Sequence, residues 1–214
     1  MNTWQTFAAK CRLCTRCNDG GLLDSKAFPI LMKSSPGGTD ILFIMEAPNR
    51  DDTYKPDKGY LTIGPNTDPS GKFFHDLFLK ELQFSEKDRF VTNSVLCLPA
   101  LKNGKYPVTS LQQSNCINNL NELIAVFNPL LVCPMGAKAL AATSRLEEHG
   151  YKTMAVSVAK PTPWYGRILF PLYHTSGQAR NPRNGRPEDR QREDWRKLRA
   201  VWQNLKAQQL RSLA

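Results

Sequence analysis

The sequence lacks any apolar run near the roughly 18 residues that a membrane span requires. Its first residues, MNTWQTFAAKCRLC, contain no signal-peptide core. We therefore expect a soluble, cytoplasmic protein that is neither exported nor membrane-spanning. Internal repeats and low-complexity linkers are also missing. Because 214 residues, 41% of them hydrophobic, can bury one sizeable core, the sequence predicts a single domain over residues 1–214 and a monomer.

Negative charge is scarce. The chain has 19 acidic and 29 basic residues, so its formal net charge is +10. Such an excess favours an anionic polymer as partner. Nucleic acid is the first candidate, and an acidic membrane surface fits less well.

The basic excess is concentrated at the C-terminus, where residues 180–214 hold ten basic and four acidic side chains. In the same segment Trp195, Leu198 and Trp202 recur at helical spacing after Pro187. This pattern predicts a basic C-terminal helix with one face packed on the body and its Arg and Lys side chains outward. The outward face is either solvated or in contact with phosphates.

Four short apolar segments have the composition of strands buried on both faces: 41–45, 90–95, 130–134 and 168–173. Helical patterns over residues 68–83, 109–127 and 136–143 separate them. Strands that alternate with helices indicate right-handed crossovers and a parallel sheet between helical layers. We expect the α/β class, as a three-layer α/β/α sandwich around a four-stranded parallel sheet.

A polar or small residue stands at the end of each predicted strand: Glu46, Asn93, Gly136 and His174. In open parallel sheets, ligands bind at the carboxyl ends of the strands, so these residues should share one edge. A carboxylate, an amide and an imidazole could together hold a polar heterocycle there. They could also help to break a bond between such a ring and a sugar.

Six cysteines occur, and a chain without an export signal favours a metal or cluster site over disulfides. The stretch CRLCTRC contains two overlapping C-x-x-C pairs, and Cys97 and Cys116 form a second pair. Residues 1–35 would then be a cluster-binding segment folded over the sheet, with zinc or a [4Fe-4S] cluster held by four thiolates. Cys133, within LLVCPMG, is expected to be a buried strand residue.

Several of these stretches resemble motifs of the uracil-DNA glycosylase superfamily, closest to its iron-sulfur branch, family 4. The resemblance runs from Cys11 to about Trp202 and rests on AAKCRLC, MEAPN, VTNSVLCLPA, SNCINNL, FNPLLVCPMGAKAL and YHTSGQAR. It implies that four of the cysteines bind a [4Fe-4S] cluster, with zinc as the alternative metal. The implied ligands are Cys11, Cys14, Cys97 and Cys116.

The resemblance also implies a monofunctional DNA glycosylase that flips a nucleotide out of the duplex and hydrolyses its N-glycosidic bond. Three residues would be catalytic. His174 would donate to the base oxygen as negative charge develops, Glu46 would stabilise the sugar cation or orient water, and Asn93 would read the Watson-Crick edge of the base.

Other positions follow from the same resemblance. The implied base pocket consists of Ala47, Pro48, Asn49, Tyr60, Thr62 and Phe73. The loop after His174 would enter the minor groove and contact DNA through Ser176, Gln178, Arg180 and Arg183.

One loop departs from the family pattern. GYLTIGP places Thr62 where the family has a phenylalanine that stacks on uracil, and Tyr60, Phe73 or Phe74 would have to replace that ring. Three hypotheses follow. The chain excises uracil in DNA repair, excises a bulkier modified pyrimidine such as a modified cytosine of phage DNA in antiviral defence, or binds DNA through a cluster-bearing fold without catalysis.

Overall fold

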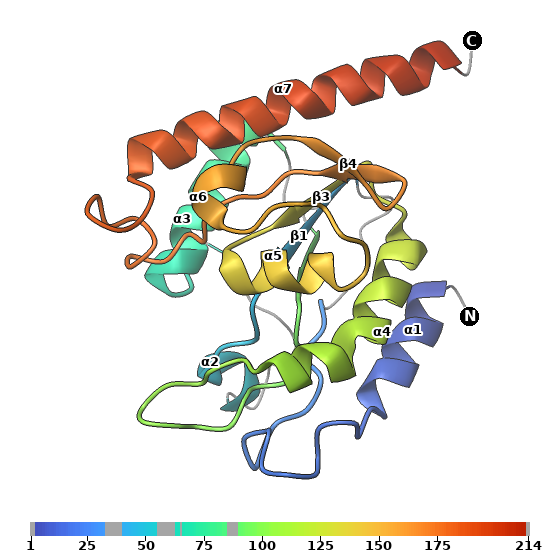
Figure 1. Cartoon of the computed structure of the whole chain (residues 1–214), viewed down its shortest axis with the longest axis vertical. Coiled ribbons are helices and arrows are strands. Elements are labelled where there is room, and N and C mark those ends of the chain that lie inside the picture. The colour runs from blue at the N-terminus through green and yellow to red at the C-terminus, as the bar shows by residue number, and fades with distance from the viewer. Residues whose placement is uncertain (1–2, 33–39, 55–62, 65, 85–89, 213–214) are drawn as a thin grey trace.

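The computed structural model describes residues 3–32, 40–54, 63–64, 66–84 and 90–212. A twisted sheet lies between two layers of helices, so the expected α/β/α class is confirmed (Figure 1). Among the described residues, no helix is long and apolar enough to cross a bilayer.

The sheet has five strands in the order β2-β1-β3-β5-β4. Four are mutually parallel: β1 (Ile41–Met45), β2 (Phe90–Asn93), β3 (Leu131–Pro134) and β5 (Arg167–Leu169). These are the four strands expected from the sequence: β1 has the expected bounds, and the ends of the other three lie within four residues of the expected ones.

The fifth strand corrects the expected count of four. The edge strand β4 (Thr162–Trp164) pairs antiparallel with β5 through a tight turn at Tyr165 and Gly166, which both have positive φ. Pro163 disguises this strand in the sequence, because proline removes a ladder donor and is tolerated only at a sheet edge.

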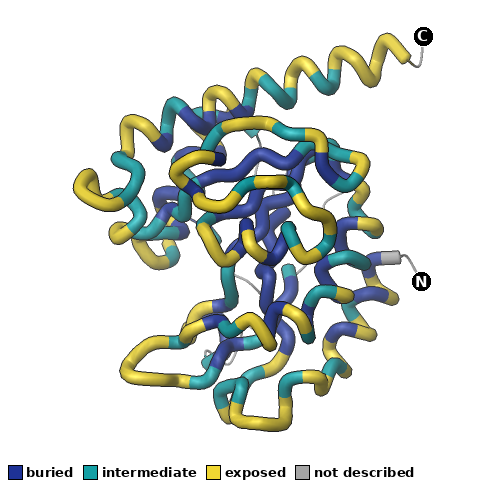
Figure 2. Tube along the Cα trace, viewed as in Figure 1, coloured by how far each residue is buried: buried dark blue, intermediate teal, exposed yellow. Residues whose placement is uncertain are grey.

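Both faces of the sheet are covered, which explains the continuous apolar run of β1. Leu42 and Ile44 join one core with α1 (Thr3–Arg12), α4 (Ser110–Phe127) and α5 (Ala137–Ser144). Ile41 and Phe43 join the other core with α3 (Pro69–Leu77), its π-helical continuation η1 (Phe78–Leu82) and α7 (Glu188–Ser212). The buried trace in Figure 2 marks this central layer.

The predicted C-terminal helix is present but begins at Glu188, so residues 180–187 form a loop rather than part of the helix. Trp195 anchors it by stacking on Phe43, with ring centroids 5.2 Å apart. Residues 207–212 of α7 are exposed and extend past the body of the molecule (Figures 1 and 2). Two short helices, α2 (Arg50–Tyr54) and α6 (Met154–Ser157), complete the fold.

Candidate active site

The parallel register brings the polar strand ends to one edge of the sheet. Met45 pairs with Asn93, so Glu46 and Asn93 end neighbouring strands. A bridge between Met135 and Leu172 continues the β3 and β5 pairing toward Gly136 and His174. Gly136 has φ 94°, a conformation that other residues rarely adopt, at the residue that precedes α5. Two cavities open at this edge, and His174 lines both.

The smaller cavity has a volume of about 150 Å³, and cavities of that size hold a six-membered ring. It is lined by Met45, Ala47, Asn49, Asp52, Ile63, Asp68, Ser70, Gly71, Asn93 and His174. Asn93 is 2% exposed, and within the described chain neither its amide nitrogen nor its amide oxygen has a hydrogen-bond partner. Buried amides are almost always paired, so this one is free to bind a ligand with one donor and one acceptor.

His174 is held in one orientation at the wall shared by the two cavities. Its Nδ1 accepts a hydrogen bond of 3.1 Å from the backbone N–H of Ser176, so the neutral ring carries its proton on Nε2. Burial lowers the pKa of His174, and the nearby Asp68 carboxylate opposes that shift. The ring is therefore a neutral hydrogen-bond donor at physiological pH.

Glu46 lines the larger cavity, about 480 Å³ in volume, together with His174, Ser176 and Gln178. Burial raises the pKa of Glu46, while the Lys138 ammonium and the Val108 backbone N–H oppose the shift. Lys138 also donates to the Val108 carbonyl at 3.1 Å, which fixes the cation beside the carboxylate. The arrangement holds a carboxylate that can accept a proton or stabilise a cation next to the smaller cavity.

Not every residue expected in the base pocket is there. Ala47 and Asn49 line the smaller cavity, and Pro48 is buried but does not line it. Phe73 does not line this cavity: its ring borders another hollow on α3, with the Arg180 guanidinium 4.6 Å from its centroid. Tyr60 and Thr62 fall outside the described residues.

Sequence reasoning missed several residues of the smaller cavity. Asp68 and Ser70 lie at the N-terminus of α3, where the Asp68 carboxylate caps the helix by accepting from Gly71 N–H at 2.7 Å. Asp52 and Asn49 cap α2 reciprocally, with 2.8 Å between Asp52 N and Asn49 Oδ1. The signal was available, because helices that follow parallel strands begin at the carboxyl edge of the sheet.

The loop after His174 is fastened at both ends. Thr175 and Ser70 hydroxyls lie 2.9 Å apart, which joins the loop to α3. At its other end Arg186 makes two hydrogen bonds to the buried Asp194 carboxylate, at 2.6 and 2.8 Å. Gln191 donates to the carbonyls of both His174 and Arg186. The loop is thereby anchored to α7.

The expected DNA-contacting residues of this loop differ in their surroundings. Ser176 and Gln178 line the larger cavity, and Arg183 is exposed. Arg180 instead turns toward α7, where its guanidinium lies 3.2 Å from Glu188 and over the Phe73 ring. Part of the positive charge expected to meet phosphates is therefore neutralised within the protein.

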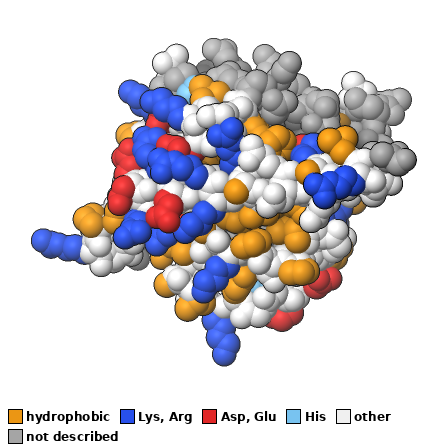
Figure 3. Space-filling view, turned by 90° about the horizontal axis from the view of Figure 1, so that it is seen from above, with side chains coloured by type: hydrophobic (Ala, Val, Ile, Leu, Met, Phe, Trp, Pro, Cys, Tyr) orange, Lys and Arg blue, Asp and Glu red, His pale blue; other side chains and the backbone are white. Residues whose placement is uncertain are grey.

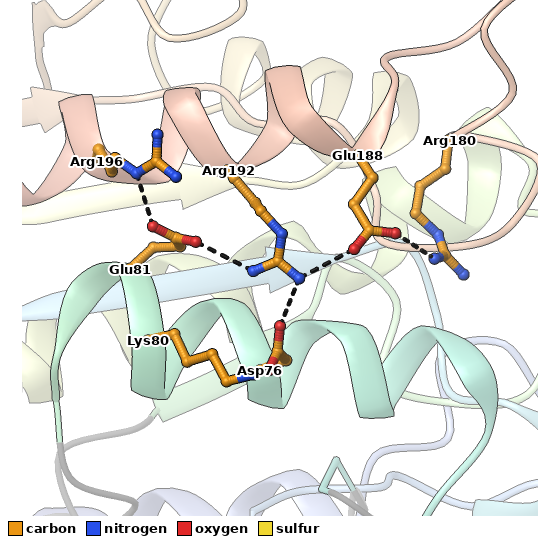
Figure 4. A network of polar contacts seen from close by, with 7 residues as sticks. All are labelled: Asp76, Lys80, Glu81, Arg180, Glu188, Arg192 and Arg196. Carbon is orange, nitrogen blue, oxygen red and sulfur yellow. Dashed lines mark hydrogen bonds and ion pairs between the residues drawn. The ribbon is translucent and has the colours of Figure 1, made fainter.

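Much of the positive charge of α7 is also neutralised by acidic side chains of the protein. Arg192 contacts Asp76 at 2.6 Å, Glu81 at 3.0 Å and Glu188 at 2.9 Å, and Arg196 also reaches Glu81 (Figure 4). Figure 3, which looks onto the top of the molecule, shows acidic and basic side chains interleaved. Paired acids also lie beside Arg190, Lys197 and Lys206. The net positive charge of this segment overstates its free cationic surface.

Four cysteines surround a separate cavity on the α4 side of the sheet: Cys14, Cys17, Cys97 and Cys116. Cys11 does not line it. It lies on the buried face of α1 with Trp4 and Phe7, at helical spacing, and is 1% exposed. The cavity is therefore lined by the second C-x-x-C pair, whereas Cys11 packs in the core next to it, close enough to Cys116 and Cys14 to interact with their thiols. Cys133 is fully buried in β3.

Two asparagines of α4 point N–H groups at these thiols. Asn119 Nδ2 lies 3.8 Å from Cys116 Sγ and 3.9 Å from Cys14 Sγ, and Asn115 Nδ2 lies 3.4 Å from Cys17 Sγ. Burial, with a smaller contribution from the Cys14 and Cys17 thiols, raises the pKa of Cys116 to about 11, although hydrogen bonds from the Leu96 backbone and the Asn119 side chain oppose the shift. A bound cation would therefore be needed to ionise the group at neutral pH. Sulfur donors with N–H groups aimed at them fit an iron-sulfur or zinc centre. Within the described residues, however, no three His, Cys, Asp or Glu side chains are arranged to hold a single metal ion.

Comparison with known families agrees with this geometry. Residues 32–200 match the uracil DNA glycosylase superfamily, a span that includes the strand ends, both cavities and the loop after His174. No individual curated protein shows significant similarity to the chain. A match over most of the sequence, together with the α/β/α fold, shows that the chain belongs to the uracil DNA glycosylase superfamily.

Proposed function

We propose that the protein is a monofunctional DNA glycosylase that excises a flipped pyrimidine from DNA. The observation that carries the proposal is the unpaired amide of Asn93 in a ring-sized cavity whose wall is completed by His174. A pyrimidine presents neighbouring donor and acceptor groups on its Watson-Crick edge, and one amide can pair with both.

The residues around the cavity fit the bond-breaking step. Breaking the N-glycosidic bond leaves negative charge on the base, which the Nε2–H of neutral His174 would stabilise. The sugar gains positive charge. Glu46, at the neighbouring cavity, would either stabilise that charge or orient the attacking water. Deglycosylation then releases an intact base and leaves an abasic site in an unbroken strand.

The cysteine cavity supports a bound [4Fe-4S] cluster or zinc as part of the proposal. We assign Cys14, Cys17, Cys97 and Cys116 as its ligands, because these four line the cavity and Cys11 does not. The metal centre would supply no chemistry at the base. It would join the segment after α1 to the loop after β2 and to α4, and so stabilise the fold.

The substrate is tested on duplex oligonucleotides that each carry one uracil, hypoxanthine or modified cytosine. For at least one pyrimidine, we expect the DNA strand to break at the abasic site after alkali treatment and to remain unbroken before it. Uracil is the first candidate on family grounds, and a bulkier modified pyrimidine, as in defence against phage, is the second. No excision from any substrate by protein with its metal centre intact would favour the third hypothesis, a DNA-binding protein without catalysis.

Thr62 separates the two enzymatic candidates and stays a prediction from the sequence. If uracil is the substrate, Thr62→Phe adds a stacking ring and should leave its excision unchanged or faster. If a substituent of the base occupies that space, the same ring should clash and slow excision of the modified base. Unchanged rates on every substrate would mean that Thr62 does not contact the base.

A further inference from the structure

A hairpin with a two-residue turn projects from the protein between β2 and α4. Lys102 N–H donates to the Lys105 carbonyl at 2.8 Å, and Lys105 N–H donates back at 3.0 Å. Asn103 and Gly104 at its tip have φ values of 50° and 72°. Positive φ at both positions is the geometry of a type I′ turn, the tight connection that Asn-Gly favours. Residues 101–105 are all exposed, so the hairpin is a defined projection (Figure 2).

The hairpin carries two lysines directly opposite each other. Like charges at facing positions of an antiparallel pair repel and destabilise it. Within the described chain, neither Lys102 nor Lys105 has an ion-pair partner, in contrast to Arg192, Arg196 and Lys197 of α7. Two ammonium groups without ion-pair partners on a defined turn are available to bind an anion.

Cations and aromatic rings continue from the hairpin onto α2. Lys26 Nζ lies 5.3 Å and the Arg50 guanidinium carbon 5.2 Å from the Tyr54 ring centroid. The hydrogen bond to Asp24 raises the pKa of Tyr54, and Tyr106, at the end of the hairpin, is close enough to add to that shift. One acid, Asp24, lies on the same surface and accepts the Tyr54 hydroxyl at 2.5 Å. Cations interleaved with aromatic rings are typical of surfaces that follow a nucleic-acid backbone.

The position of the hairpin relative to the site gives this surface a role. The hairpin follows β2, and the loop after His174 follows β5, with β1 and β3 between these strands. The two loops leave the molecule on the same side, one below and one above α5 in Figure 1. The base of the hairpin also contacts the site, because the Val108 backbone N–H lies at the Glu46 carboxylate.

We propose that the hairpin, residues 101–106, together with Lys26, Arg50 and Tyr54, is a second DNA contact that grips the sugar-phosphate backbone beyond the base pocket. This inference rests on the proposed function. The loop after His174 holds DNA on one side of the target nucleotide, and the hairpin holds the backbone on the other. Lys102 and Lys105 bind phosphates and carry no sequence information.

The test compares Lys102→Ala/Lys105→Ala with two controls. Lys102→Arg/Lys105→Arg keeps the charge, and Arg199→Ala/Arg211→Ala removes the same charge from α7. Affinity for a fluorescent 30-base-pair duplex is measured across a range of salt concentrations. The alanine pair should weaken binding roughly tenfold or more near 100 mM salt and lower the salt slope by about 2. The arginine pair should bind like the wild type.

A second arm locates the contact. Duplexes with one target base are shortened from one end or from the other. Shortening from one of the two ends should abolish the difference in affinity between the wild type and the alanine pair. Shortening from the other end should leave that difference unchanged. An equal loss of affinity in the α7 control, or an unchanged salt slope in the alanine pair, would overturn the proposal.

These outcomes are separate from the fate of the proposed function. The excision rate at saturating protein should be the same for the alanine pair and the wild type, since neither lysine lies at the base pocket. Suppose that the wild type excises no base, but that the alanine pair binds DNA more weakly and with a smaller salt slope than the wild type. That result would contradict the glycosylase proposal and still support the hairpin contact.

Discussion

Replacing Asn93 with leucine should stabilise the folded protein while it removes activity. The Asn93 side chain is 2% exposed, and both of its polar atoms lack partners within the described chain. A buried polar group without a partner costs about 1–3 kcal/mol, and leucine has a similar volume without that cost. Water can enter a cavity of about 150 Å³ and pair with part of the amide. We therefore expect Asn93→Leu to stabilise the folded protein by the lower end of that range, about 1 kcal/mol.

A gain of that size should raise the midpoint of thermal unfolding by about 2–4 °C for a domain of this length. Asn119→Leu is the matched control, because Asn119 is also buried but donates to the Cys14 and Cys116 thiols. That variant should unfold at a lower temperature than the wild type. Thermal unfolding and single-turnover excision are measured on the same preparations. An Asn93→Leu variant destabilised as much as Asn119→Leu would refute the claim that the amide is kept unpaired for a ligand.

Three further predictions concern the anchor of the loop, the metal ligands and pH. Arg186→Ala should destabilise the protein by about 3 kcal/mol, because it leaves Asp194, 1% exposed, without its partner. Asp194→Ala should cost less, since Arg186 is 27% exposed and can be solvated, and denaturant unfolding of both variants checks this order. Cys17→Ser should lower the iron or zinc content of the purified protein, whereas Cys11→Ser and Cys133→Ser should keep it, as measured by elemental analysis. Excision requires the Glu46 carboxylate, and burial raises the pKa of Glu46. As the pH falls, the excision rate should therefore begin to decline at a higher pH than it would with an ordinary glutamate. Glu46→Gln should abolish excision at every pH. A pH–rate profile without this acidic limb would contradict the role of Glu46.

The buried strands and the polar residues at their ends could be predicted from the sequence because both follow from short-range patterns. A run such as Ile41 to Ile44 can be satisfied only between two helical layers, and parallel pairing then fixes where Glu46 and His174 lie. The β4 strand could not be recognised, because three residues with a central proline carry no periodic signal.

The position of Cys11 also follows from a short-range pattern. Trp4, Phe7 and Cys11 recur at helical spacing, which places Cys11 on the core face of α1, whereas Cys14 and Cys17 follow the end of that helix. The unpaired state of Asn93 and the neutralisation of α7 could not be predicted in this way. Both depend on which side chains from distant segments come within hydrogen-bonding distance, as Arg192 does with Asp76 and Glu81.

The most direct test of the glycosylase proposal is mass-spectrometric detection of free base released from a duplex under single-turnover conditions. We predict that the wild type releases an intact pyrimidine and leaves an abasic site in an unbroken strand. His174→Ala should bind the same duplex with similar affinity and release the base at least a hundredfold more slowly, in line with the loss of one well-placed hydrogen-bond donor. Base release by His174→Ala at the wild-type rate, or no release of any pyrimidine by the wild type, would contradict the account.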